Sequence, residues 1–293
     1  MHKIEIPSKN TVIEFPEEIS EMTVEQYIAF CSLILQFTNK EISYGELRVQ
    51  LTYVLLNLIR KVDVSKQNEQ ADAVSENVYR ISQLMDCFFD TNEKDGKAFK
   101  TVKLDNIDNK IPSIEIQKHM YTGPADALTD LKFGQYIQAL NAYIDYAKTK
   151  DEYYLNHLVA TLYTAKDEAL DNNSKDRKAA LFSLVSLAQR YGVYLFFQGC
   201  QEWIATNRAL DIGGGHTVDL SVLFIPSKNS ESDGKSIGML SAMYTLAESG
   251  VFGDMEKVAN QNLYDALVYM VQKHNEVLKL KKNAKNTRSK GVS

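Results

Sequence analysis

The sequence has little cysteine and no long apolar run. Its three cysteines, Cys31, Cys87 and Cys200, are far apart, form no CxxC pair and lie in apolar surroundings. This pattern indicates buried, reduced thiols in a cytosolic environment and fits a disulfide framework poorly. No apolar run approaches the roughly 20 residues of a membrane span, so we expect no membrane contact. The first residues, MHKIEIPSKNTVIEF, alternate and carry charge, so we expect no signal peptide.

Catalytic and metal-binding motifs are also missing. No G-x-S-x-G nucleophile elbow occurs, so the glycines of Gly213 to His216 have no nucleophile to serve and predict a flexible turn before a strand. The histidines form no H-x-x-x-H or H-x-x-E pair, so we expect no metal site. They are His2, His119, His157, His216 and His274.

One segment, Asn229 to Ser236, ends in Gly-Lys-Ser as a P-loop does. Asn229 replaces the glycine that the first turn of such a loop requires, and Glu231 and Asp233 would place carboxylates in an anion site. We expect an ordinary surface loop here. We therefore assign no catalytic, cofactor-binding or metal-binding residue and expect a protein that is not an enzyme, while an enzyme without a recognisable motif stays an alternative.

The totals are those of a folded soluble protein of one large or two ordinary domains: 293 residues, 44% apolar and 24% charged. The net charge of −5 argues against nucleic-acid binding by the whole surface. It is unevenly distributed, because Lys279 to Lys290 holds six basic residues and no acid, which leaves −11 for the rest. We expect the segment 281–293 to be a disordered tail, and a weak nucleic-acid contact through it stays open.

Apolar residues recur mostly at helical spacing, which predicts a mainly α fold. The clearest case is Thr129 to Ala165, a helical hairpin with Thr129 as N-cap and the polar run Lys148 to Glu152 as its connection. Its buried faces should contain Phe133, Tyr136, Ile137, Leu140, Ile144 and Ala147 in the first helix and Leu155, Leu158, Val159 and Leu162 in the second.

In the first part of the chain, Ile4 to Ile6 and Val12 to Phe15 alternate as a small β-hairpin does. Thr23 and Gln26 form a capping box that opens a helix. Two further helices are expected, from about Tyr44 to Ile59 and from Val74 to Phe88, and a second hairpin near Ala98 to Leu104.

In the second part, Ala179 to Trp203 is strongly apolar, with Gly192 and Gly199 as expected bends. Thr217 to Ile225 alternates like a strand. Helices are expected at 238–249 and 255–280, the last burying Val277 and Leu278. Pro112 and Gly123-Pro124 mark a joint, so we predict an N-terminal β-hairpin plus helical lobe, 1–111, and a C-terminal helical lobe, 112–280.

Tyrosine is abundant, with 16 residues, and each buried hydroxyl needs a hydrogen-bond partner. Most of the tyrosines in the helical regions should lie at the edge of the core, although some could instead line a protein interface. These residues are Tyr143, Tyr146, Tyr153, Tyr154, Tyr163, Tyr191 and Tyr194.

Three segments together resemble uncharacterised proteins encoded in the structural-gene modules of tailed bacteriophages and prophages of gut anaerobes. They are EMTVEQYIAF, then YTGPADALTDLKFGQYIQALNAYIDYAKTKDEYYLNHLVATLY, then YTLAESGVFGDMEKVANQNLYDALVYMVQKHNE. The resemblance implies a non-enzymatic virion protein of the tail or neck, or a tail assembly chaperone absent from the mature particle. It further implies other phage structural proteins as partners, with a homo-oligomer also open, and a location in the virion or in the host cytoplasm during assembly.

Overall fold

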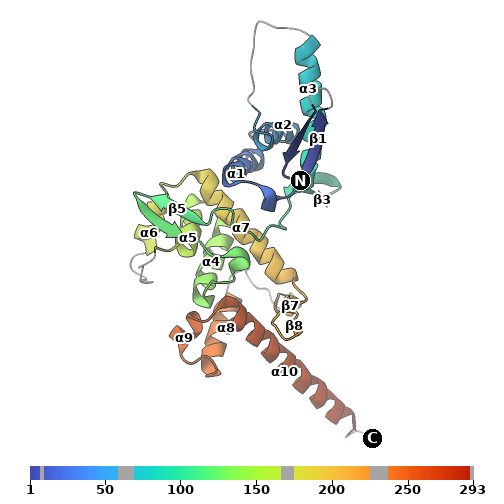
Figure 1. The fold of residues 1–293 in the computed structure, drawn as a ribbon. Coiled ribbons are helices and arrows are strands. Elements are labelled where there is room, and N and C mark those ends of the chain that lie inside the picture. Colours follow the sequence, from blue (N-terminus) through green and yellow to red (C-terminus); the bar gives the residue numbers. More distant parts are fainter. Residues whose placement is uncertain (7–9, 59–68, 166–174, 225–236, 291–293) are drawn as a thin grey trace. The chain divides into compact units, whose positions relative to one another are not determined.

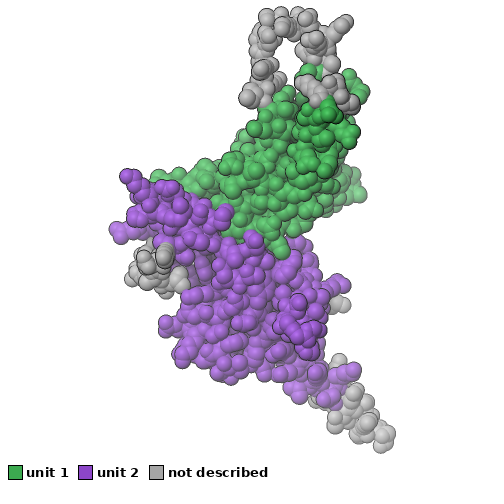
Figure 2. Space-filling view, viewed as in Figure 1, with its two compact units in different colours: residues 1–111, 183–196 green, residues 112–182, 197–293 purple. Residues whose placement is uncertain are grey.

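The computed structural model describes residues 1–6, 10–58, 69–165, 175–224 and 237–290 (Figure 1). Helices dominate these residues, and the strands form short two-stranded antiparallel sheets. The predicted mainly α fold is therefore confirmed. Contacts divide the chain into two compact units, shown in Figure 2: unit 1 is Met1–Ile111 with Ser183–Phe196, and unit 2 is Pro112–Phe182 with Phe197–Ser293.

Unit 1 begins with the predicted hairpin, in which β1 (His2–Ile6) pairs with β2 (Thr11–Phe15). The Thr23–Gln26 capping box is confirmed, and a second one, Ser43–Glu46, opens the next helix. Leu58 lies within the predicted helix 44–59, whose apolar face was expected to bury it, but it is 39% exposed because the helix ends three residues earlier. The helices are α1 (Val24–Thr38), α2 (Tyr44–Leu55) and α3 (Glu69–Ser82), followed by the 3-10 segment η3 (Gln83–Phe88).

The second predicted hairpin is also present, as β3 (Phe89–Lys94) paired with β4 (Lys97–Val102). Asp95 and Gly96 connect the strands with φ values of 53° and 72°. Two consecutive positive φ values define the turn whose twist matches that of the flanking strands. The Asp-Gly pair therefore fixes the register of this hairpin.

Helix α7 (Leu187–Thr206) runs through both glycines that were expected to bend it. At Gly192 a Cβ would lie 3.1 Å from the Tyr27 ring and 3.3 Å from the Cys31 sulfur, and the Tyr27 hydroxyl donates to the Gly192 carbonyl at 2.8 Å. Glycine thus allows α1 to approach this helix closely. This packing places 183–196 in unit 1, whereas the sequence had assigned the segment to the second lobe.

Unit 2 contains the predicted helical hairpin. Lys150, with a φ of 59°, ends the first helix, and the Asp151 carboxylate accepts from the Tyr153 N–H at 2.9 Å to cap the second. The predicted N-cap is wrong, since the first helix begins at Phe133 after Lys132. The helices are α4 (Phe133–Thr149), α5 (Glu152–Leu162), α6 (Lys175–Phe182), α8 (Ile237–Glu248), α9 (Met255–Ala259) and α10 (Leu263–Lys290).

Two backbone hydrogen bonds join the start of α4 to the start of α10. The Phe133 N–H donates to the Gln261 carbonyl, and the Leu263 N–H donates to the Leu131 carbonyl, both at 2.9 Å. The N–H groups of a first helical turn have no partner within their own helix. Each segment therefore satisfies a donor at the start of the other's helix.

Side chains reinforce this junction. The Asn262 amide donates to the Thr129 carbonyl at 2.7 Å while its oxygen accepts from the Tyr264 N–H at 2.8 Å. The Tyr264 hydroxyl donates to the carbonyl of Ala127, a residue in the left-handed region with a φ of 53°. Because Asn262 bonds to the backbone on both sides, it interrupts the single helix that was predicted from 255 to 280.

Helix α10 also extends further than predicted. It continues to Lys290, so residues 281–290, expected to be disordered, are helical. Lysine, alanine and arginine favour helix, and neither glycine nor proline occurs before Gly291. Residues 291–293 lie outside the described part of the chain.

The β elements of unit 2 differ from the prediction. A strand was expected at 217–225, but only β8 (Thr217–Val218) forms there, paired with β7 (Leu210–Asp211). A 3-10 turn, Leu220–Leu223, follows β8. A hairpin not predicted from the sequence, β5 (Ser113–Ile116) and β6 (His119–Thr122), turns at Gln117 and Lys118 with φ values of 50° and 68°. This pair is not a typical turn sequence.

Gly134 provides a test of the packing in unit 2. A Cβ at this position of α4 would lie 2.8 Å from the Ala259 Cβ and 3.1 Å from the Ala259 carbonyl oxygen. We expect Gly134→Ala to destabilise unit 2 by about 1–3 kcal/mol, because α9 must move away. Urea unfolding measures the change.

The matched control is Gly45→Ala in α2, where the nearest atom, Ser43 Oγ, is 4.0 Å from the new methyl group. This substitution should be neutral or stabilise by about 0.5–1 kcal/mol, because it only lowers the entropy of the unfolded chain. An unchanged unfolding midpoint for Gly134→Ala would contradict the close approach of α4 and α9.

Candidate interaction surface

The strongest candidate surface is the second half of α10, where an apolar stripe continues after its cover ends. Leu263, Ala266 and Leu267 are fully buried, and Val271 is 4% exposed. Val277 and Leu278 continue the same face at helical spacing. They are 47% and 51% exposed, which corrects the prediction that both are buried.

The exposed part begins at Gln272. From there to Asn283 each side chain is exposed except that of His274, which is half-buried. Leu280 is 68% exposed and lies beside the stripe. Figure 1 shows this part of α10 extending away from α8 and α9 to the C terminus.

Basic residues surround the exposed leucines. Lys279, Lys281 and Lys282 are exposed. Lys281 also lies on the side of the helix that carries the apolar stripe. One face of a single helix therefore changes from buried apolar residues, through the exposed Val277 and Leu278, to the exposed Lys281.

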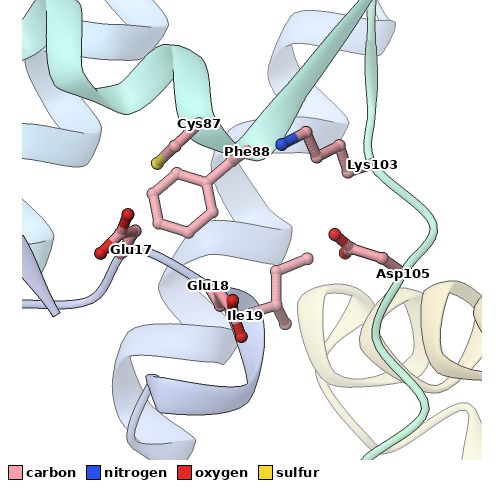
Figure 3. A pocket seen from close by; sticks show the side chains of 7 residues that line it. All are labelled: Glu17, Glu18, Ile19, Cys87, Phe88, Lys103 and Asp105. Atoms are coloured by element: carbon pink, nitrogen blue, oxygen red, sulfur yellow. The ribbon is translucent and has the colours of Figure 1, made fainter.

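A second candidate is an open hollow of about 150 Å³ in unit 1 (Figure 3). Charged groups surround an apolar floor formed by Ile19 and Phe88, and the Glu17 carboxylate also lies 3.3 Å from the N-terminal amino group. The residues that line it are Glu17, Glu18, Ile19, Cys87, Phe88, Lys103 and Asp105.

Cys87 is the nucleophilic side chain of this hollow. Burial raises the pKa of its thiol to about 11, although the positive charge of Lys103 opposes the shift. At neutral pH the group is therefore a protonated thiol, and the thiol form is a poor nucleophile. The hollow consequently offers weak support for covalent chemistry.

A third cluster, also in unit 1, is centred on Tyr44. Its hydroxyl donates to Asp86 at 2.7 Å, and Arg48 donates to the same oxygen at 3.2 Å. Arg48 and Lys100 lie over the Tyr44 ring, 5.2 Å and 5.4 Å from its centroid, within cation–π distance. The carboxylate and ring thus hold two cations between α2, η3 and β4, which is a structural role.

A fourth cluster is on the surface of unit 2. His157 Nε2 lies 3.3 Å from Asp176 Oδ1 without hydrogen-bond geometry, and the Tyr153 hydroxyl donates to the same oxygen at 3.3 Å. Burial lowers the pKa of His157, and the charge of Asp176 opposes that shift. Asp176 is 83% exposed, so water screens this charge.

Three further features of the sequence are the P-loop-like segment, the glycine run and the possible metal ligands. The segment Asn229–Ser236 lies outside the described residues. Gly213, Gly214 and Gly215 all have positive φ and form the turn between β7 and β8. Among the residues that the structure describes, no group of three or more His, Cys, Asp or Glu side chains could hold a metal ion.

The tyrosines divide between core and surface. Tyr146, Tyr163, Tyr191 and Tyr194 are buried, and Tyr153 is 52% exposed. Tyr143 and Tyr154 are half-buried. The sequence expectation of tyrosines at the edge of the core thus describes part of this set.

No single helix in the described ranges is long and apolar enough to cross a membrane, and one pair, Lys175–Phe182 with Leu187–Thr206, passes by length and composition only when joined across a bend. Comparison with family models, curated proteins and solved structures gives no match.

The Tyr44 cluster predicts an acid-sensitive contribution to stability. Partial burial opposes ionisation of Asp86, but the hydrogen bonds from Tyr44 and Arg48, and the nearby cations, give a net lowering of its pKa. An aspartate whose pKa is lower in the folded chain than in the unfolded chain stabilises the fold at pH values above its ordinary pKa of about 3.9. This stabilisation is lost as the pH falls below that value and through the folded-state pKa. Because Asp86 is 45% exposed, we expect Asp86→Asn to cost about 1 kcal/mol or less at pH 7.

Urea unfolding of unit 1 as a function of pH measures this effect. The free energy of unfolding of the natural chain should decrease below about pH 4, and that of the variant should decrease less. Asp90→Asn, at an exposed position on β3, is the control and should keep that decline. Equal pH profiles for Asp86→Asn and the natural chain would contradict the assignment.

Cys87 predicts slow alkylation. At pH 8 a thiol with a pKa of about 11 is about one-thousandth thiolate, against about one-quarter for an ordinary thiol. Iodoacetamide labelling followed by peptide mass spectrometry should therefore be slower in the native chain than in urea, on the order of a hundredfold. Lys103→Gln should slow it further, since the lysine charge lowers the thiol pKa. Equal native and denatured rates would contradict this environment.

Proposed function

We propose that this chain is a non-enzymatic structural protein of a tailed-bacteriophage particle, in the tail or neck, that acts through protein–protein contacts. The phage assignment rests on the three segments that resemble proteins of phage structural-gene modules. The mode of action rests on one observation, the exposed apolar stripe at the end of α10.

The composition of this stripe favours a protein partner. Val277, Leu278 and Leu280 are 47%, 51% and 68% exposed, so completing their burial against an apolar surface would contribute roughly 1–2 kcal/mol per side chain. Contiguous exposed apolar side chains with a polar rim are typical of protein interaction sites. The lysines beside them would pair with carboxylates at the edge of the same interface.

The rigid geometry of a helix supports the same proposal. A helix of 28 residues is about 42 Å long, because each residue adds about 1.5 Å. Its first half is held by the junction with α4, so the second half can present its side chains to a partner without first ordering a loop. Preorganisation of this kind reduces the entropic cost of binding.

Quantitative mass spectrometry of purified particles tests the proposed function. Particles of the phage that encodes this chain should contain it at a fixed copy number relative to their major structural proteins. Absence from particles, with co-purification of an unassembled tail protein, would instead identify an assembly chaperone. Absence from both fractions would refute a role in building the particle.

A further inference from the structure

The exposed end of α10 combines two properties that one partner must satisfy together. Val277 and Leu278 need an apolar surface, and the lysines that follow need negative charge. A nucleic-acid backbone would satisfy the lysines and leave the apolar side chains in water. A protein surface with apolar side chains and carboxylates would satisfy both.

The chain itself carries the matching charge. The segment Lys279 to Lys290 has a formal charge of +6, and the remainder has −11. Two copies of this segment placed side by side would repel each other, whereas one copy placed on the remainder of another brings opposite charges together. Complementary charge of this kind accelerates association and disfavours the wrong pairing.

We infer that the end of α10, with Val277, Leu278 and Lys281 at its centre, docks on the acid-rich remainder of a second copy of this chain. The contact is head to tail, so it joins two different surfaces. Such contacts generate a ring where the rotation closes and a filament where it does not. The inference deepens the proposed structural function and rests on it for the biological setting, while its test uses the purified protein alone.

Sedimentation velocity of the full chain tests this docking. The natural chain should form oligomers whose association weakens between about 50 mM and 500 mM salt, because the Debye length falls well below 10 Å. Val277→Asp/Leu278→Asp and Lys281→Glu/Lys282→Glu should each weaken association by at least about tenfold.

Matched controls separate docking from general effects on charge and folding. Leu184→Asp/Val251→Asp changes two apolar residues outside α10 that are 63% and 56% exposed. Lys94→Glu/Lys97→Glu reverses the two exposed lysines that flank the β3–β4 turn. Neither control should weaken association, because each adds negative charge only to the remainder of the chain. Circular dichroism should show the same helical content and thermal midpoint for all variants.

Cross-linking identifies the surface that receives α10. A carbodiimide joins lysines to carboxylates, and a mixture of ordinary and nitrogen-15-labelled chains distinguishes cross-links between copies from those within one. We expect mixed-isotope cross-links from Lys279, Lys281 or Lys282 to aspartates or glutamates preceding Lys279. Cross-links within single copies only would overturn the inference.

Three other results would also overturn it: a monomer at both salt concentrations, association unchanged by the α10 substitutions, or equal losses in the control variants. A monomeric chain that shifts DNA in a gel, and loses the shift in Lys281→Glu/Lys282→Glu but not in Val277→Asp/Leu278→Asp, would assign the helix to nucleic acid instead. Particle composition tests the structural function separately, so a monomer found in particles would refute only the docking.

Discussion

The reciprocal hydrogen bonds between the starts of α4 and α10 are the constraint on which unit 2 depends. Phe133 and Leu263 each donate to a carbonyl in the other's segment, across about 130 residues of sequence. Tyr264 and Asn262 add side-chain bonds to carbonyls before α4. This junction fixes the residue at which α10 begins. The start of α10 in turn determines that Val277 and Leu278 lie beyond the neighbouring segments that bury its first half.

Close helix packing and satisfied hydroxyls explain much of the remaining core. Glycine occurs where two helices approach most closely, at Gly134 and Gly192, because a side chain there would collide with its neighbours. Two fully buried tyrosines have hydrogen-bond partners: Tyr27 donates to a carbonyl, and Tyr136 donates to Gln201 at 2.8 Å. Burial raises the pKa of Tyr136, so its hydroxyl stays protonated and can act as this donor. Tyr27 and Tyr136 thus contribute apolar area to the core with paired hydroxyls, whereas the buried Tyr269 hydroxyl has no hydrogen-bond partner among the described residues.

The clearest grouping of like charges in this protein is a segment of the chain, the basic end of α10, and not a pocket. The hollow beside Cys87 is open, and its thiol is protonated at neutral pH. Six of the 33 basic residues, in contrast, lie in the segment Lys279 to Lys290, without an acid, at the end of one helix that also exposes leucine. These side chains therefore support the proposal of binding through a surface, in which the lysines would face negative charge on the partner.

The sequence determined the mainly α class, the helical hairpin, the Thr23–Gln26 cap and the second β-hairpin near Ala98 to Leu104, because each depends on residues close together in the chain. It did not reveal the turn at Gln117 and Lys118, because neither residue type is typical of a turn with positive φ values. It also placed Val277 and Leu278 in the core. Periodicity shows that a helix has an apolar face, but only tertiary structure decides where that face is covered, since the covering residues come from distant segments.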